Sequence, residues 1–391
     1  MNKYGTQICI LSGQVDPNLL PILDGKTRPK KVIILVSEEM KRNVDSFTSA
    51  IDALVDWEIV NVPDAYDIEA IENQLIDICA DLDTDDLVVN ITGGTKPMSI
   101  AAFTVCTQQQ IPCFYIDTNN TVQLFTPNPT TSGFLVTKSH FEAKLNEKQF
   151  LKHYLQAHDF SLVDNDDDYG FIKESEFEDF ISKVLPGDMS AAIKFLNYAA
   201  SVAKDNHLTA EVKKHQDVKT NLILETLESL NWIKVSPSHD SSLLNIQFSN
   251  EKIRRFLNGI WLEIYIERQL KAVLPSVRIY RGLKAQSHKF RNELDIVFFY
   301  DNKVYIIEAK TLDFESAGNE KQDVINKLST VKKNFGGLNA RAALVSFLDV
   351  PAELISRATK ENIAVIKTGA LRPVANFQGV LKQWIKAGSD K

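Results

Sequence analysis

Apolar positions in the first 135 residues form short, uninterrupted runs that alternate with amphipathic stretches. The runs are rich in β-branched residues and lack polar alternation, which is typical of strands buried on both faces of a parallel sheet. They predict five strands: Gln7–Leu11, Lys31–Ser37, Trp57–Val62, Asp86–Thr92 and Pro112–Asp117. Amphipathic stretches such as 68–82 and 98–109 predict intervening helices. This alternation predicts a doubly wound α/β sheet, on which ligands bind at the carboxyl ends of the strands.

The middle of the chain, from Phe141 to about Ser249, has a mostly helical pattern and an acidic composition. Within it, residues 209–248 combine helices with two strand-like pieces, Trp232–Val235 and Leu243–Phe248. Helices followed by such a hairpin resemble a winged helix-turn-helix. Because the segment is acidic and its only basic pair is Lys213-Lys214, a helical spacer without DNA contact is the favoured interpretation.

A second alternating pattern begins at Glu251. It predicts a long helix (252–273), three strands (277–281, 293–300 and 304–310), helices at 319–334, 351–361 and 376–387, and strands at 340–346 and 363–367. The chain is therefore predicted to contain an α/β domain over 1–138, a spacer over 139–250 and a second α/β domain over 251–391.

Charge differs strongly between these parts. The formal net charge of the 391 residues is −7, which by itself argues against nucleic-acid binding. Residues 251–391 hold 24 basic and 15 acidic residues, a net of +9, whereas residues 1–250 have a net of −16. This asymmetry indicates a division of labour, with nucleic-acid contact in the C-terminal part.

The sequence carries no signal for export or for a membrane span. The N-terminus lacks a secretory apolar region, and runs such as Val32–Val36 are too short to cross a bilayer. The four cysteines (Cys9, Cys79, Cys106 and Cys113) have no Cys-x-x-Cys spacing and are predicted to be buried thiols of a cytoplasmic protein. The seven histidines show no zinc-ligand spacing.

The most informative segment runs from Glu293 to Lys310, where two apolar strands flank Asp301-Asn302. A hairpin turn at that dipeptide places Asp295 opposite Glu308, and Glu293 opposite Lys310. Opposed residues have Cβ atoms roughly 4.5–5.5 Å apart. Because side chains alternate along a strand, Glu308 and Lys310 share a face. Two carboxylates and a lysine are therefore predicted to cluster within apolar strands.

Such a cluster needs a counter-charge, since opposed like charges destabilise a sheet and buried charges are rare unless paired or metal-bound. Mn²⁺ or Mg²⁺ takes oxygen ligands and would satisfy Asp295 and Glu308. Lys310 would then assist the attacking water or neutralise charge in the transition state. The alternative is a Lys310–Glu293 ion pair at a wet sheet edge, which the apolar strands disfavour.

This pattern resembles the PD-(D/E)XK nuclease superfamily over about residues 255–370. Asp295 occupies the first motif strand and Glu308-Ala309-Lys310 the (D/E)-x-K, although Leu294 replaces the usual proline before the aspartate. The resemblance implies that Asp295, Glu308 and Lys310 are catalytic and that both carboxylates bind the metal.

The superfamily often adds a helical glutamate, which would be a further catalytic residue and metal ligand. Glu263 is the preferred candidate because it lies at helical spacing from Phe256 and Ile260, on a core-facing stripe. Glu267, one turn further along, is the alternative.

Basic residues beside this cluster form a predicted nucleic-acid-binding patch that would neutralise phosphates in a salt-dependent way. A merely solvated loop is the alternative. The patch consists of Arg278, Arg281, Lys284, Lys289 and Arg291.

A second site is predicted in the first domain, where a strand runs into Thr92-Gly93-Gly94-Thr95-Lys96. The glycines let backbone N–H groups approach a ligand, and the start of the next helix at Pro97 favours an anion. The loops at Ser12-Gly13-Gln14 and at Ser37 follow other strands and complete the predicted ligand site. A tight turn without a ligand is the alternative, and the spacing matches neither the P-loop nor the dinucleotide fingerprint.

With Ser12 after the first strand, this loop resembles the CARF domain, a Rossmann-like sensor of cyclic oligoadenylates in type III CRISPR immunity, over residues 5–135. A CARF domain followed by a PD-(D/E)XK domain resembles the CRISPR ancillary nucleases. The resemblance implies that residues 12–14 and 92–96 contact the ligand. It also implies a homodimer that binds one cyclic tetra-adenylate across its two-fold axis and then cleaves single-stranded DNA, nicks DNA and, in some members, cleaves RNA.

We therefore expect an α/β protein with an N-terminal Rossmann-like CARF sensor, a helical or winged-helix-like spacer and a C-terminal PD-(D/E)XK domain. Its expected activity is that of a cyclic-oligoadenylate-activated, metal-dependent endonuclease. The main alternative is a ligand-responsive transcriptional regulator that reads DNA through residues 209–248. A third is a sensor that degrades its own cyclic ligand.

Overall fold

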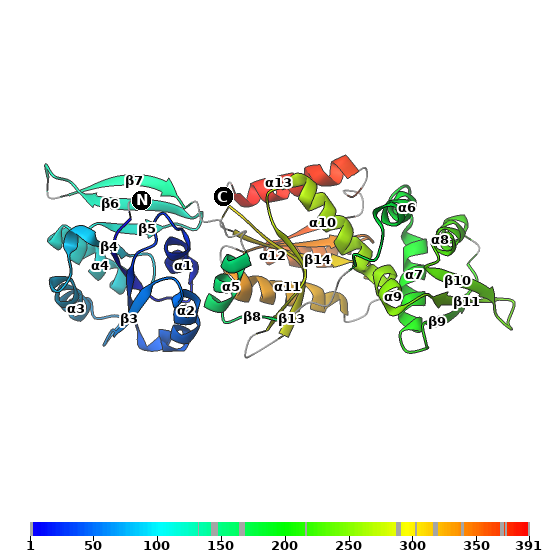
Figure 1. Ribbon diagram of the computed structural model, residues 1–391, viewed down its shortest axis with the longest axis horizontal. Helices are drawn as coiled ribbons and strands as arrows, with labels where there is room; N and C mark the ends of the chain where they lie inside the picture. The colour runs from blue at the N-terminus through cyan, green and yellow to red at the C-terminus, as the bar shows by residue number, and fades with distance from the viewer. Residues whose placement is uncertain are drawn as a thin grey trace.

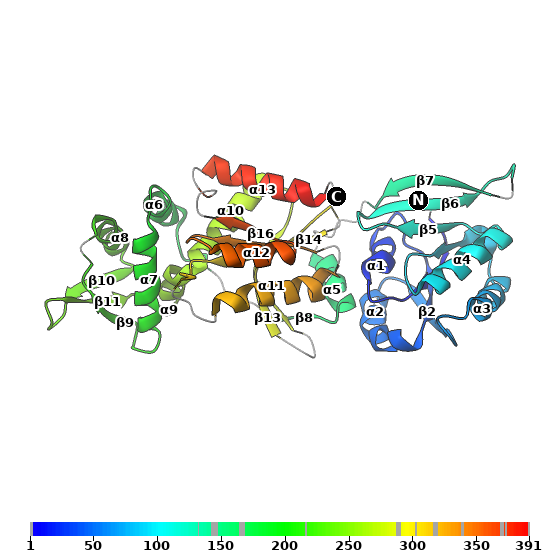
Figure 2. The ribbon, with the colours of Figure 1, turned by 180° about the vertical axis from the view of Figure 1, so that it is seen from behind.

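The computed structural model describes residues 3–131, 133–141, 148–163, 169–215, 217–286, 291–301, 303–315, 320–337, 340–367, 371 and 374–389. The molecule is elongated, with three units in a row (Figure 1, Figure 2). The N-terminal sheet lies at one end, the winged unit of the middle segment at the other, and the C-terminal α/β unit between them. Within the described residues, no helix is both long and apolar enough to cross a membrane.

The first unit is a seven-stranded sheet in the order β3-β2-β1-β4-β5-β6-β7. Its parallel strands follow the predicted runs: β1 (Thr6–Ile10), β2 (Lys31–Val36), β3 (Asp56–Asn61), β4 (Leu87–Asn90) and β5 (Cys113–Ile116). Helices α1 (Asp16–Leu23) and α2 (Val44–Ile51) cover one face, and α3 (Ile68–Ala80) and α4 (Lys96–Gln109) cover the other. The doubly wound architecture is confirmed.

An antiparallel hairpin of β6 (Thr121–Pro127) and β7 (Phe134–His140) extends this sheet beyond β5. The sequence analysis did not predict it. Most residues of β7 are exposed, so the strand lacks the buried alternation that would have revealed it.

The central unit is a six-stranded sheet in the order β16-β15-β14-β13-β12-β8. Strands β12 (Ile279–Gln286), β13 (Arg291–Tyr300) and β14 (Lys303–Lys310) are antiparallel, and β15 (Ala340–Ser346) and β16 (Ile363–Lys367) run parallel to β14. Helices α10 (Trp261–Val273) and α13 (Val374–Ser389) pack on one face, and α11 (Glu320–Gly336) and α12 (Ala352–Lys360) pack on the other. The second α/β domain is confirmed.

The helix predicted over 252–273 is interrupted. Helix α9 (Glu251–Arg255) leads into a π-helical turn, η3 (Phe256–Ile260), before α10 begins. Gly259 in this turn has a φ of +132°, which favours glycine. A Cβ at Gly259 would lie 3.1 Å from Oγ1 of Thr311, so the kink brings the start of α10 against the end of β14.

The far unit has winged-helix order: α6 (Glu174–Val184), α7 (Ser190–Ala203), β9 (Thr209–Lys213), α8 (Val218–Ser229), β10 (Ile233–Pro237) and β11 (Leu243–Phe248). Its strands pair in the order β10-β11-β9. Strand β8 (Ser161–Val163) comes from the predicted spacer yet pairs with β12 of the central sheet.

Helix α5 (Lys148–Ala157) connects the first and central units. On one side, Nδ1 of His153 lies 2.6 Å from the carbonyl oxygen of Ala50 in α2. On the other, Tyr154 packs edge-on against Phe299 of β13, with ring centroids 5.1 Å apart. One apolar core therefore runs from the first sheet into the central sheet.

Candidate functional site

The carboxyl end of β14 brings three of the predicted catalytic residues together. Nζ of Lys310 lies 2.7 Å from Oε1 of Glu308 and 3.5 Å from Oδ2 of Asp295. Lys327 of α11 adds a second cation, 3.6 Å from Oε1 of Glu308. The sequence analysis missed Lys327, because only the packing of α11 on the sheet brings it to this end.

The hairpin register was predicted correctly from Tyr300↔Lys303 to Ile296↔Ile307, while Asn302 of the predicted turn lies outside the described residues. Among the described residues, the pairing of β13 with β14 ends there. The next residue, Asp295, instead accepts a hydrogen bond from the backbone N–H of Ala309 through Oδ2, at 2.8 Å. The cluster therefore forms where the two strands separate.

The structure does not contain the predicted juxtaposition of Glu293 and Lys310. Glu293 is exposed and pairs in register with Lys284 of β12. Lys310 contacts Glu308 and Asp295, and its strand lies between β13 and β15 rather than at an edge. A plain Lys310–Glu293 ion pair at a sheet edge is therefore excluded.

Burial shapes the electrostatics of this cluster. Desolvation, reinforced by the negative charge of Glu308, raises the pKa of Asp295 to about 6. Burial alone would lower the pKa of Lys310, but the carboxylates of Asp295 and Glu308 raise it above its ordinary value. Lys310 is therefore a cation held between two carboxylates, one of which is costly to ionise.

Glu263 is electrostatically part of this cluster. Desolvation raises its pKa well above the usual range, Asp295 raises it further, and Arg281 and Lys310 oppose the shift. Glu267, the alternative candidate, is engaged elsewhere: Lys271 lies 2.6 Å and Arg281 3.1 Å from its carboxylate. The structure therefore favours Glu263 over Glu267.

The donor set fits a hard divalent cation bound through two carboxylates. Half-buried Asp295 and buried Glu308 provide oxygen ligands whose mutual repulsion a cation would relieve. Among the described residues, no group of three or more Asp, Glu, His or Cys side chains converges closely enough to form a metal site. Glu263 as a third direct ligand stays a prediction.

The winged unit borders this site, which the sequence analysis did not anticipate. Nδ2 of Asn197 in α7 donates a 2.6 Å hydrogen bond to the carbonyl oxygen of Thr311, the residue after Lys310. Lys194, one turn earlier, lies 2.8 Å from Asp313. No sequence pattern links these distant segments.

The predicted basic patch is only partly available to a ligand. Arg278 is exposed, with its guanidinium 5.2 Å from the ring centroid of Tyr280, and Lys284 is half-buried in β12. Arg281 is ion-paired with Glu267, which disfavours it as a phosphate contact. Arg291 begins β13, and Lys289 lies outside the described residues.

The glycine loop of the first unit is closely packed. A Cβ at Gly93 would lie 2.1 Å from the carbonyl oxygen of Ile10, and one at Gly94, where φ is +81°, would lie 2.4 Å from Cγ2 of Ile10. Thr95 caps α4 by accepting from the N–H of Met98. Within the described part of the chain, the N–H groups of Gly93 and Gly94 have no hydrogen-bond partner, as an anion-binding loop requires.

The hydroxyl groups near this loop serve the fold itself. The Thr92 hydroxyl donates to Oδ1 of Asn90 and accepts from the N–H of Ile116, and the Thr95 hydroxyl donates to the carbonyl oxygen of Ala65. The Ser12 hydroxyl donates to the carbonyl oxygen of Gln14. Ligand contact from this loop therefore depends more on backbone N–H groups and Lys96 than on hydroxyls.

The other predicted contacts have different surroundings. Ser37 is buried at the N-terminus of the 3-10 helix η1 (Glu38–Asn43), whereas Lys96 and Gly13 are exposed. A Cβ at Gly337, just after α11, would lie 2.7 Å from Oε1 of Gln14. The loop after β1 thus contacts the central unit directly.

Two family models match separate parts of the chain. The Card1 CARF domain matches residues 6–150, and the Card1-like endonuclease domain matches residues 250–387. The chain is a Card1-like CARF endonuclease. No curated protein sequence matches it. The match to an endonuclease domain disfavours the alternative that the chain is a transcriptional regulator.

Solved structures share the fold across nearly the whole chain. Can2 from Sulfobacillus thermosulfidooxidans, solved with cyclic tetra-adenylate, is 22% identical with a TM-score of 0.76, covering 98% of this chain and 97% of that one. Protein VC1899 from Vibrio cholerae is 20% identical with a TM-score of 0.78, covering 99% of each chain. A type III CRISPR defence DNA nuclease activated by cyclic oligoadenylate is 13% identical with a TM-score of 0.52, covering 90% of this chain and 47% of that one.

Proposed function

We propose that this CARF endonuclease is activated by a cyclic oligoadenylate, most specifically cyclic tetra-adenylate, and acts in the cytoplasm in type III CRISPR antiviral defence. Its substrates would be single-stranded DNA, duplex DNA that it nicks, and RNA. The observation that carries the proposal is the Lys310 ammonium between Glu308 and Asp295, in a chain whose residues 6–150 match the CARF domain.

Asp295 and Glu308, assisted by Glu263, would hold Mn²⁺ or Mg²⁺. When bound, the cation supplies charge neutralisation at the scissile phosphate and a more acidic water. Lys310 would orient the attacking water and offset negative charge as it develops on the phosphate. The Ala309 N–H keeps the Asp295 carboxylate fixed for this role.

The ligand would lie over residues 12–14, Ser37 and residues 92–96, between two copies of the chain. Support for a homodimer comes from exposed apolar side chains on α4 and on β7 of the same unit. They are Ile100, Phe103, Leu135 and Val136. Ligand binding would change the arrangement of the nuclease units through the contacts of α1 and Gln14 with the rest of the molecule.

The test is cleavage of single-stranded DNA, supercoiled plasmid and RNA with Mn²⁺ or Mg²⁺, against a panel of cyclic oligoadenylates. We expect cleavage that needs both metal and activator and is lost in the Glu308→Ala, Lys310→Ala double variant.

Sequence-specific DNA binding without cleavage would instead support the transcriptional regulator. Linear products from the cyclic ligand would add ligand degradation. Light scattering with and without ligand tests the homodimer.

A further inference from the structure

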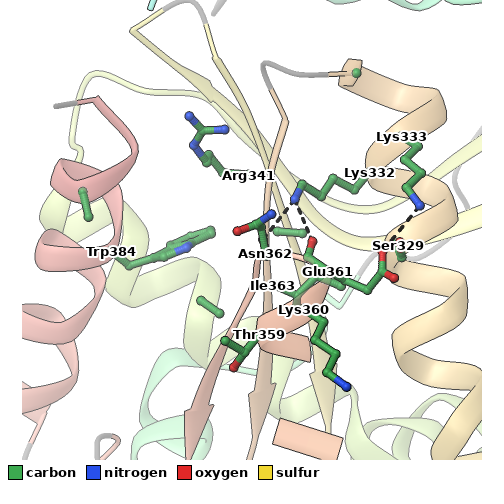
Figure 3. Close-up of a pocket in the computed structure, with 14 residues that line it drawn as sticks. Ser329, Lys332, Lys333, Arg341, Thr359, Lys360, Glu361, Asn362, Ile363 and Trp384 are labelled. Carbon is green, nitrogen blue, oxygen red and sulfur yellow. Dashed lines mark hydrogen bonds and ion pairs between the residues drawn. The ribbon is translucent and has the colours of Figure 1, made fainter. Parts of the chain in front are cut away.

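A cavity of about 670 Å³ opens in the central unit at the amino ends of β15 and β16 (Figure 3). We call it the α11–α13 pocket, because α11, α12 and α13 surround it. Its charged and aromatic lining residues are Lys332, Lys333, Arg341, Lys360, Glu361 and Trp384. The pairs Tyr305↔Arg341 and Lys310↔Ser346 place it about 16 Å from Lys310 along the strands, at roughly 3.3 Å per residue. None of the candidate catalytic residues lines it.

The pocket carries an excess of positive charge, since four cationic side chains and one carboxylate line it. That carboxylate, Glu361, is already engaged by Lys333 at 3.4 Å and by the hydroxyl of Ser329 at 2.5 Å. Lys332 donates to the carbonyl oxygens of Glu361 and Asn362, both at 3.0 Å, so its hydrogen bonds do not cancel its charge. A pocket of this kind suits an anion.

Trp384 gives the pocket a rigid aromatic wall. Its ring packs edge-on against Tyr305 and Phe298, with centroids 5.3 and 6.4 Å away. Figure 3 shows the indole extending from α13 toward the polar residues of the pocket. An aromatic ring beside cations is the combination that binds a nucleotide of single-stranded nucleic acid, by stacking and phosphate contact. The cavity volume is in the usual range for one such small group.

We propose that the α11–α13 pocket binds one nucleotide of the substrate strand, outside the catalytic cluster. Its base would lie against Trp384, and the two phosphates that flank it would lie near Arg341 and Lys360, which Figure 3 shows on opposite sides of the pocket. The proposal rests on the proposed function, because it makes the pocket an anchoring site for the strand that the nuclease cuts. Gly337 lines the same pocket and lies against Gln14 of the ligand loop. Activator binding at that loop would therefore alter the affinity of the pocket for the strand.

The test measures the affinity of a fluorescent single-stranded DNA for the full-length, cleavage-deficient Glu308→Gln variant without divalent metal, over a range of salt. In that background, Arg341→Gln and Lys360→Gln should each weaken binding about fivefold to tenfold and reduce the salt slope by roughly 0.7, the loss of one phosphate contact. Lys382→Gln, on the exposed side of α13, is the control and should bind as the parent does. Quenching of tryptophan fluorescence by the strand should diminish in Trp384→Phe.

Unchanged affinity and salt slope in both pocket variants would overturn the proposal. Weakened binding of cyclic tetra-adenylate with unchanged strand binding would also overturn it, because the pocket would then belong to the activator. Cleavage assays on the otherwise native chain separate the two claims. A protein that binds the strand through this pocket but cleaves nothing would refute the proposed function and leave the pocket assignment standing.

Discussion

The carboxylate of Asp295 accepts a hydrogen bond from the backbone N–H of Ala309, 2.8 Å away, at the point where β13 and β14 separate. The side chain takes the place of a backbone acceptor, so the two strands part without leaving this buried N–H unpaired. The same bond fixes the carboxylate beside Lys310. Fold and proposed chemistry therefore depend on one contact.

Asp295→Asn should stabilise the metal-free protein at pH 7.5 while abolishing cleavage. The folded-state pKa of Asp295 is raised from 3.8 to about 6, so the native state binds the proton more tightly than the unfolded chain does. Native stability therefore falls as pH rises through this window, and the cost persists above it. Thermal and urea unfolding should show a gain of roughly 1–3 kcal/mol at pH 7.5 and almost none near pH 4.

Added Mn²⁺ provides the control for this prediction. The ion should raise the melting temperature of the wild type and should raise that of Asp295→Asn much less, since a ligand is lost. A variant that is less stable than the wild type at pH 7.5 without metal would contradict the electrostatic account.

Lys310→Met should reduce single-turnover cleavage by about 10²–10³-fold with cyclic tetra-adenylate affinity unchanged, because its ammonium lies between the two carboxylates and would offset charge on the phosphate. Lys382→Met, exposed on α13, is the matched control and should cleave normally. A rate within a few-fold of the wild type would remove Lys310 from the mechanism.

Local pattern was enough to predict most of the fold and half of the candidate site. A two-residue turn predicted at Asp301-Asn302 implies a hairpin register by short-range geometry, and β13 and β14 pair in that register. The proximity of Asp295 to Glu308 could therefore be derived from sequence. Proximity of Glu263 depends on the kink at Gly259, a backbone conformation that no periodicity reveals. The predicted helical spacing of Glu263 from Phe256 crosses this interruption, which the sequence analysis did not foresee.

Long-range contacts account for what the sequence could not predict. Arg281 was assigned to nucleic acid because it is one of several neighbouring cations, yet Glu267 from another element pairs with it. Strand β8 is too short to be recognised and acquires its place only by pairing with β12. Likewise, Gln14 contacts Gly337 across more than 300 positions of sequence.

Lys96→Ala should weaken cyclic tetra-adenylate binding about tenfold, the usual consequence of losing a charged hydrogen-bond partner. Its side chain is exposed, so the melting temperature should not change. Lys30→Ala, another exposed lysine of the same unit, should retain full affinity in calorimetry. Equal affinities for the two variants would remove Lys96 from the ligand site.

Gly93→Ala should both destabilise the protein and abolish ligand binding. An added Cβ would lie 2.1 Å from the carbonyl oxygen of Ile10, so the loop has to move away from β1. Gly25→Ala is the control, since no heavy atom lies within 4 Å of its added Cβ. Normal ligand binding by Gly93→Ala would show that the loop conformation is not required.

The Asp16–His158 pair should transmit activation from the ligand loop to the nuclease unit. Asp16 begins α1 directly after that loop, and its Oδ1 lies 2.8 Å from Nε2 of His158, which follows α5. The ring of His158 lies tilted against that of Tyr154, with centroids 4.5 Å apart, and Tyr154 packs edge-on against Phe299 of β13. Asp16→Asn and His158→Gln should therefore lower the ratio of activated to basal cleavage several-fold. Ligand binding and basal cleavage should be nearly unchanged.

The double variant makes this prediction specific. If the pair acts as a unit, Asp16→Asn combined with His158→Gln should reduce the activation ratio no further than either single change. His239→Gln, exposed between β10 and β11, should leave the ratio intact. Two results would contradict the prediction: additive losses in the double variant, or full activation in both single variants at unchanged melting temperature. Either would show that the signal reaches the nuclease unit by another route. The Gln14–Gly337 contact would then be the first alternative to test.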